Sequence, residues 1–178
     1  MHTYDTRPMP DDGLKLCNVA VLAEQGRAVA LSVPIQKLER IAPQLLRSDG
    51  MATGSVALSM QEGRIIADVE VAAAVEVRCL RCLQPMTLAL EGRSQVALVE
   101  SEADAAKVPE LETALASGGR MRLADLLEEE LLLELPASPR HAGQCPGQPE
   151  QKAEEFVDSV QRPFAALGQL LKPDRSKQ

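Results

Sequence analysis

The chain has 178 residues, a formal net charge of −7, two phenylalanines, one tyrosine and no tryptophan. Its length allows one ordinary domain with a hydrophobic core, and a tail. An acidic chain repels phosphate, and scarce aromatic rings leave no platforms for base stacking, so the composition argues against a broad nucleic-acid surface.

The chain also lacks the features of a membrane or secreted protein. No apolar run approaches the ~20 residues of a membrane span. The polar N-terminus, MHTYDTRPMPDDG, has neither the basic start nor the apolar stretch of a secretion signal. We therefore expect a cytoplasmic protein without membrane contact. In a reducing compartment, spaced cysteines indicate metal binding or thiol chemistry more than disulfides.

The N-terminal part of the chain predicts a strand and a helix after a flexible segment, residues 1–16. Residues 27–33, RAVALSV, alternate between apolar and polar positions as in a strand. Pro34 then opens a helical stretch that ends at the turn residues 48–50. Its apolar face is formed by three residues at helical spacing, Leu38, Ile41 and Leu45.

The middle of the chain predicts a meander of antiparallel strands. Four runs are rich in β-branched or alternating residues: 53–60, 64–77, 86–90 and 94–99. Turn residues stand between two pairs of them, at Glu62-Gly63 and Glu91-Gly92. The acidic segment 100–107 is expected to be a surface loop or a short helix. The strands should form a curled sheet or a partial barrel.

The segment LADLLEEELLLEL, residues 123–135, gives the strongest helix prediction. Leucines recur on one side at helical spacing: Leu123, Leu127 and Leu131, widened by Leu126 and Leu133. The acidic residues are expected to face solvent: Glu128, Glu129, Glu130 and Glu134. Pro136 ends the helix. The predicted fold is therefore α+β, with this long helix packed on a curled antiparallel sheet and a flexible C-terminal tail.

The composition changes after Pro136 and divides the chain. We expect a single α+β domain over residues 17–136, a proline-rich linker over 137–161, and a docking peptide and tail over 162–178. The last segment holds apolar residues at helical spacing: Phe164, Leu167, Leu170 and Leu171. They form either a capping helix docked on the parent domain or a short peptide that binds a partner.

The stretch VRCLRCLQPM places Cys79 and Cys82 three residues apart. A redox pair of the thioredoxin kind needs its first cysteine at a helix N-terminus, whereas here a strand leads into the pair and another follows. A zinc knuckle fits better, because a tight turn between strands can aim both thiolates at one ion. His141 and Cys145 would complete a Cys₃His site. The alternative is an unmetallated turn with free thiols. Cys17 lies outside this scheme and is expected to be a small buried residue.

Three features in this order resemble the bacterial YceD family, the large ribosomal RNA subunit accumulation proteins. The first is a C-x-R-C-L-x-P turn, at residues 79–85. The second is a D-L-L-E-x-E-x-L-L-x-L-P helix, at residues 125–136, and the third is the closing RPFAALGQLLK, at residues 162–172. The resemblance covers most of the chain and is strongest from Val77 onward. Many relatives carry extra cysteines after the helix, often as a second CxxC, where this chain has only His141 and Cys145.

The resemblance implies a role in the synthesis, processing or stability of 23S ribosomal RNA, and hence in building the large subunit. The implied partners are ribosome assembly or RNA-processing proteins, with the 23S precursor contacted directly or indirectly. No catalytic residues carry over from the family, and the sequence shows no nucleophile–base pair. We therefore expect a non-enzymatic factor that acts mainly through protein contacts.

Two other functions remain as alternatives. The first is direct RNA binding through arginines near the CxxC hairpin, namely Arg78, Arg81 and Arg93, with Arg120 and Arg122 as further candidates. Those arginines are equally well explained as ion-pair partners on the surface. The second is an enzyme, either a metal-dependent nuclease or a thiol oxidoreductase, for which the sequence offers no positive support.

Overall fold

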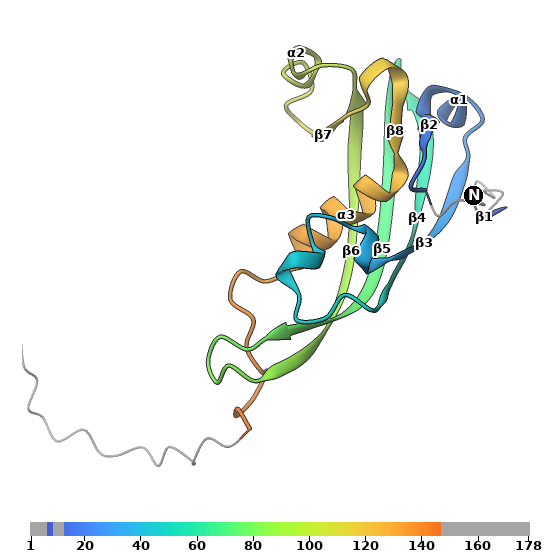
Figure 1. Ribbon diagram of the computed structural model, residues 1–178. Coiled ribbons are helices and arrows are strands. Elements are labelled where there is room, and N and C mark those ends of the chain that lie inside the picture. Colours follow the sequence, from blue (N-terminus) through green and yellow to red (C-terminus); the bar gives the residue numbers. More distant parts are fainter. Residues whose placement is uncertain (1–6, 9–12, 147–178) are drawn as a thin grey trace, which may run out of the picture. The chain divides into compact units, whose positions relative to one another are not determined.

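The computed structural model describes residues 7–8 and 13–146, and their main element is a six-stranded sheet (Figure 1). The spatial order of its strands is β1 (Arg7–Pro8), β3 (Ala28–Pro34), β4 (Met51–Gln61), β5 (Arg64–Arg78), β6 (Pro85–Val99) and β7 (Glu112–Leu115). Strands β3 to β6 pair antiparallel, whereas the edge strands β1 and β7 pair parallel with their neighbours. The sheet is open, so the expected α+β fold with a mostly antiparallel sheet is confirmed.

The remaining elements are short, except for one helix. A two-stranded sheet pairs β2 (Leu16–Asn18) with β8 (Arg120–Arg122). The α-helices are α1 (Val19–Glu24), α2 (Glu102–Ala105) and α3 (Leu123–Glu134), and the 3₁₀ turns are η1 (Ile35–Lys37), η2 (Ala42–Gln44) and η3 (Ser117–Gly119). In the described part of the chain, no helix is long and apolar enough to cross a membrane.

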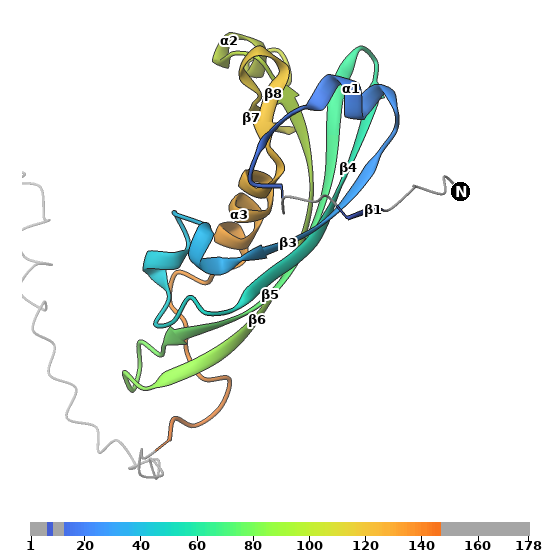
Figure 2. The same cartoon turned by 45° about the vertical axis from the view of Figure 1, so that its right-hand side comes forward.

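The sheet curves around α3, which lies across its concave face (Figures 1 and 2). Along β5, valines and alanines at alternate positions are buried, while Glu70 and Ala72 on the other face are exposed. This alternation places one face of the strand in the core. The helix contributes Leu123, Leu127 and Leu131, all fully buried in the same cluster. The predicted helix is therefore confirmed, with its end one residue earlier than expected. Its leucine face is confirmed except at Leu133, which is 59% exposed instead of widening the buried face.

The turn expected at Glu91-Gly92 is wrong, because one continuous strand, β6, runs through it. Glu91 pairs with Ala72 and Gly92 with Val71, in unbroken register. Gly92 lies beneath α3, where an added Cβ would be 2.6 Å from Oε1 of Glu130 and 2.9 Å from Cγ of Glu134. The glycine thus permits a close approach of the helix rather than a chain reversal.

The helix expected after Pro34 is also wrong, because the chain forms η1 and η2 instead. Leu38 between them is extended, with φ −93° and ψ 98°. Pro43 would remove a hydrogen bond and clash inside a continuous helix, which favours two short turns. Leu38 and Ile41 are nevertheless buried in the core. The spacing therefore identified the apolar residues correctly but not their backbone conformation.

The solvent-facing role expected for the acidic residues of α3 is wrong at two positions. Glu128 and Glu130 are only 4% and 5% exposed. Oε1 of Glu128 accepts hydrogen bonds from the backbone N–H groups of Arg40, at 2.7 Å, and Ile41, at 3.1 Å. This carboxylate therefore holds the segment between η1 and η2 against the helix. Its neighbour Glu129 is exposed and pairs with the Arg40 guanidinium.

Other expectations concern residues outside the described part of the chain. These are most of the N-terminal segment 1–16, the C-terminal half of the proposed linker 137–161, and the docking peptide and flexible tail over 162–178. The domain boundaries drawn from composition stay predictions.

Candidate metal centre

The turn between β5 and β6 forms the first half of the cysteine cluster. The N–H of Cys79 donates to the carbonyl of Gln84 at 2.9 Å, and the N–H of Leu83 donates to the carbonyl of Cys79 at 2.8 Å. These bonds close the turn and require Leu83 to adopt a left-handed φ of +63°, which costs a residue with a side chain about 1–2 kcal/mol. The tight closure places Cys79 and Cys82 on one side of the turn.

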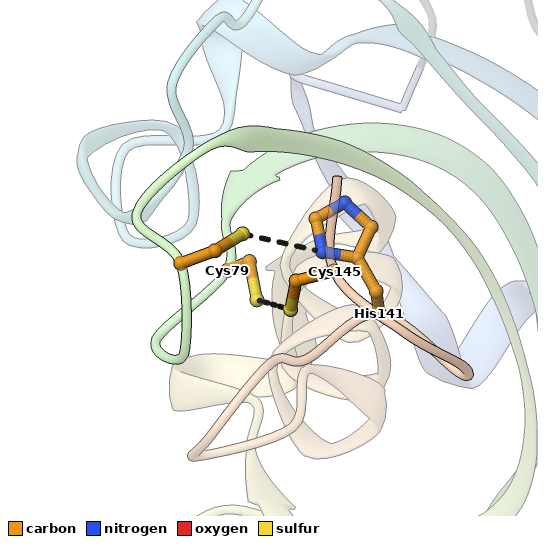
Figure 3. Close-up of side chains that lie close together, drawn as sticks. Cys79, His141 and Cys145 are labelled. Carbon is orange, nitrogen blue, oxygen red and sulfur yellow. Dashed lines mark hydrogen bonds between the residues drawn. The ribbon is translucent and has the colours of Figure 1, made fainter. Parts of the chain in front are cut away.

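The chain after α3 forms the second half. The N–H of Leu80 donates to the carbonyl of Pro139 at 2.8 Å. Nη1 of Arg81 donates to the carbonyl of Gly143 at 2.9 Å. Residues 79–82 therefore hold the segment that follows the helix, and this segment carries His141 and Cys145. Figure 3 shows Cys79, His141 and Cys145 pointing toward one another.

The four side chains lie close enough together to hold one metal ion. Their ligand atoms all lie within 4.8 Å of one another. Sγ of Cys79 is 3.9 Å from Sγ of Cys145, and Sγ of Cys82 is 3.5 Å from Nδ1 of His141. Around a tetrahedral zinc, with Zn–S of about 2.3 Å and Zn–N of about 2.0–2.1 Å, two sulfurs are about 3.8 Å apart and a sulfur and a nitrogen about 3.6 Å apart. Both distances and the donor set therefore fit zinc.

The environment shifts the pKa values of the Cys79 and Cys145 thiols in opposite directions. Burial raises the pKa of the Cys79 thiol, but backbone N–H groups of Cys82, His141 and Arg81 outweigh it and lower that pKa to about 5. The Arg81 N–H lies 3.4 Å from this sulfur. Burial, followed by the neighbouring Cys82 and Cys79 thiols, raises the pKa of Cys145 to about 11. A divalent cation would offset the burial and the thiol contacts that raise the pKa of Cys145.

The surroundings do not suit a redox pair. Cys79 follows the last residue of β5, and β6 begins at Pro85, so among the described elements no helix begins at either cysteine of the turn. Cys79 is fully buried, which keeps it from a protein disulfide substrate. Cys17 lies elsewhere, in β2, where its Sγ donates to the carbonyl of Met121 at 3.4 Å.

The arginines proposed for RNA binding do not gather at one place. Arg78 is the last residue of β5, beside the turn. Arg81 lies within the turn and donates a hydrogen bond to the carbonyl of Gly143. Arg93 lies eight residues along β6 from Pro85, about 25 Å away at the rise of a strand, and its Nη1 is 3.3 Å from Oε1 of Glu70. Arg122 pairs with Asp125. The four apolar residues proposed for partner binding, Phe164, Leu167, Leu170 and Leu171, lie outside the described residues.

Comparison with protein families identifies the family of the chain. A family model described as large ribosomal RNA subunit accumulation protein YceD matches residues 67–171, more than half of the chain. The matched range contains most of β5, all of β6 and α3, and every residue of the Cys₃His cluster. No curated protein and no solved structure matches the chain.

Proposed function

Since the chain belongs to the YceD family of large ribosomal RNA subunit accumulation proteins, we propose that it supports the accumulation of 23S ribosomal RNA, and thereby of large ribosomal subunits. We propose further that it does so without catalysis, in the cytoplasm, mainly by contacting ribosome assembly or RNA-processing proteins. The family match carries this proposal, because it covers the cysteine turn and the acidic-leucine helix together.

Charge favours protein contacts over direct RNA binding. The chain carries 26 acidic against 19 basic residues, so its long-range field repels phosphate. Three of the candidate arginines already have acceptors, since Arg81 donates to Gly143, Arg93 pairs with Glu70 and Arg122 with Asp125. RNA would have to displace these contacts. A purified protein that binds a 23S precursor fragment with a steep salt dependence would favour the RNA-binding alternative instead.

We propose that Cys79, Cys82, His141 and Cys145 hold a structural zinc ion. The support is the donor set, the near-tetrahedral spacing and the hydrogen bonds that already bring the two halves together. Bound zinc would fix the segment after α3 to the hairpin, and such binding can supply about 10 kcal/mol or more of folding free energy to a small site.

Deletion of the gene tests the cellular role. The deletion strain should contain less 23S ribosomal RNA relative to 16S and fewer large subunits in a sucrose gradient. Complementation with Cys82→Ser should restore less than complementation with Cys17→Ser, which removes a thiol outside the cluster. Unchanged subunit ratios and unchanged precursor ends in the deletion strain would refute the proposed function.

Elemental analysis tests the zinc site. Protein purified without chelator should contain near-stoichiometric zinc, retained in Cys17→Ser and lost in Cys82→Ser. Zinc absent from the wild-type protein would leave the unmetallated turn as the explanation of the cluster. Turnover in an insulin-reduction assay that disappears in Cys79→Ser would instead restore the redox interpretation.

A further inference from the structure

A second candidate site lies beside α3, away from the cysteines. A hollow of about 630 Å³ opens between α3 and β7, and we call it the α3–β7 hollow. Its walls come from β6, β7, Met121 in the middle of β8 and one side of α3. Its volume is in the range of pockets that hold a drug-sized ligand or a few side chains of a docked segment.

Glu130 contributes a buried carboxylate to the lining of this hollow. The side chain lines the hollow, yet it is only 5% exposed. Within the described residues, no hydrogen-bond donor and no ion-pair partner contacts the Glu130 carboxylate. Glu128, two residues earlier in α3, instead accepts hydrogen bonds from two backbone N–H groups. A buried carboxylate without a partner is costly, by several kcal/mol for a charged group. A cationic donor that enters the hollow would satisfy it.

A glycine in β6 leaves space for the Glu130 side chain. Glu130 lies over Gly92, the inward-facing position of β6 at which any Cβ would come within 2.8 Å of Cγ of Glu130. The next inward-facing residue along β6, Ser94, is also small and lines the hollow. An apolar side chain at position 92 would occupy the space that the Glu130 side chain now takes. The glycine therefore allows an acidic group, rather than an apolar one, to line the hollow at this point.

The lining of the hollow is both acidic and apolar. Among the described residues that line it, four are acidic and one is basic, namely Glu112, Asp125, Glu129, Glu130 and Arg40. Arg40 is already paired with Glu129, so it leaves Glu130 unsatisfied. Two leucines at the rim, Leu115 and Leu133, are 51% and 59% exposed. A ligand that matches this surface carries positive charge next to apolar groups.

We propose that the α3–β7 hollow docks a short basic, amphipathic segment of a partner protein, with a lysine or arginine paired to Glu130 and apolar side chains against Leu115 and Leu133. The acidic lining repels phosphate and so disfavours a nucleic acid. A second copy of this chain would bring the same acidic surface and a net charge of −7. The inference rests on the hollow's own residues and does not require the proposed role in 23S accumulation.

Binding of defined peptides to the purified full-length protein tests the proposal. The probe is a short fluorescein-labelled peptide of alternating lysine and leucine, followed by fluorescence anisotropy at physiological ionic strength, where the Debye length is about 8 Å. Peptides of alternating glutamate and leucine and of alternating lysine and serine are the controls. Only the lysine–leucine peptide should bind tightly, and it should shift backbone amide signals of Thr113 and Ala114 in an NMR spectrum.

Glu130→Gln is the decisive variant, because it removes the charge and keeps the shape. It should weaken binding of the lysine–leucine peptide about tenfold, the loss expected for a charge-assisted hydrogen bond. Its thermal midpoint should not fall, because a buried charge without a partner is removed. Glu70→Gln makes the same change on the outer face of the sheet and should leave binding unchanged.

A paired exchange tests the apolar part of the hollow. Leu133→Ser should weaken binding of the same peptide, whereas Met60→Ser should not, because Met60 is an exposed apolar residue outside the hollow. Wild-type affinity in Glu130→Gln, or equally tight binding of the glutamate–leucine peptide, would overturn the proposal. Because these assays contain no ribosomes, such a failure would leave the proposed role in 23S accumulation untouched.

Discussion

Glu128→Ala should lower the free energy of unfolding by about 2–4 kcal/mol. The exchange removes the acceptor of two backbone N–H groups, at 2.7 Å from Arg40 and 3.1 Å from Ile41. Ile41 is fully buried, so its N–H group would stay without a partner, at a cost of about 1–3 kcal/mol. The Arg40 N–H lies nearer the surface, where water can replace part of the lost bond, so it contributes about 1 kcal/mol.

Equilibrium unfolding in urea measures this loss, provided that the slope of the transition is unchanged. The adjacent variant Glu129→Ala is the matched control. Its carboxylate is 51% exposed and pairs with the exposed guanidinium of Arg40, so its loss should cost about 0–1 kcal/mol. Glu128→Gln, which keeps one acceptor oxygen, should fall between the two. If Glu128→Ala and Glu129→Ala were equally mild, the carboxylate would not hold the η1–η2 segment as described.

Three further predictions concern the core, the close approach at Gly92 and the cysteine cluster. Leu127→Asp places a charge at a fully buried position of α3 and should cost on the order of 3 kcal/mol or more; a thermal midpoint equal to that of the wild type would contradict the orientation of the helix. Gly92→Ala should cost about 1–3 kcal/mol by overpacking, measured by urea unfolding. The cost should be smaller in a Glu130→Ala background, since that exchange removes the two nearest atoms that the new Cβ meets; purely additive costs would speak against the contact. A zinc chelator should lower the thermal midpoint of the wild-type protein but not that of Cys82→Ser, and equal responses of both proteins would count against a bound ion.

Local sequence patterns predicted the elements that local physics determines. The period of the leucines in α3 and the alternation along β5 are set by the geometry of a helix and a strand, so both were recognised from one segment each. Pro43 shows where such reasoning fails. The apolar spacing of Leu38 and Ile41 is compatible with a helix, but the proline within the stretch favours two short turns that bury the same two side chains.

The burial of Glu128 and Glu130 depends on residues that are distant in the sequence. Glu128 is buried because two N–H groups some 90 residues earlier need an acceptor. Glu130 is accommodated because the register of β6 places a glycine beneath it. A glutamate in an acidic run gives no local sign of either contact, so the pattern predicted a solvated face. Gly92 was likewise taken for a turn, because glycine is common in both situations.

The cysteine cluster could be anticipated because its residue types are rare in this chain, with four cysteines and two histidines in all. The CxxC spacing restricted the first pair, and only His141 and Cys145 stand close together after the helix. The α3–β7 hollow had no comparable signal. Its walls are built from common residues whose meeting depends on the parallel pairing of β7 with β6, and no spacing in the sequence reveals that pairing.

The two candidate sites lie at different ends of β6, and this separation decides how they should respond to mutation. From Pro85, next to the cysteine turn, to Ser94 in the hollow is nine residues, about 30 Å along the strand. The helix α3 runs between them, but it is fixed independently by its buried leucines and by Glu128. Loss of zinc should therefore release residues 137–146 without reshaping the hollow. Exchanges at sites this far apart without shared contacts usually act additively, so Cys82→Ser should leave the binding of a basic peptide, and its dependence on Glu130, unchanged.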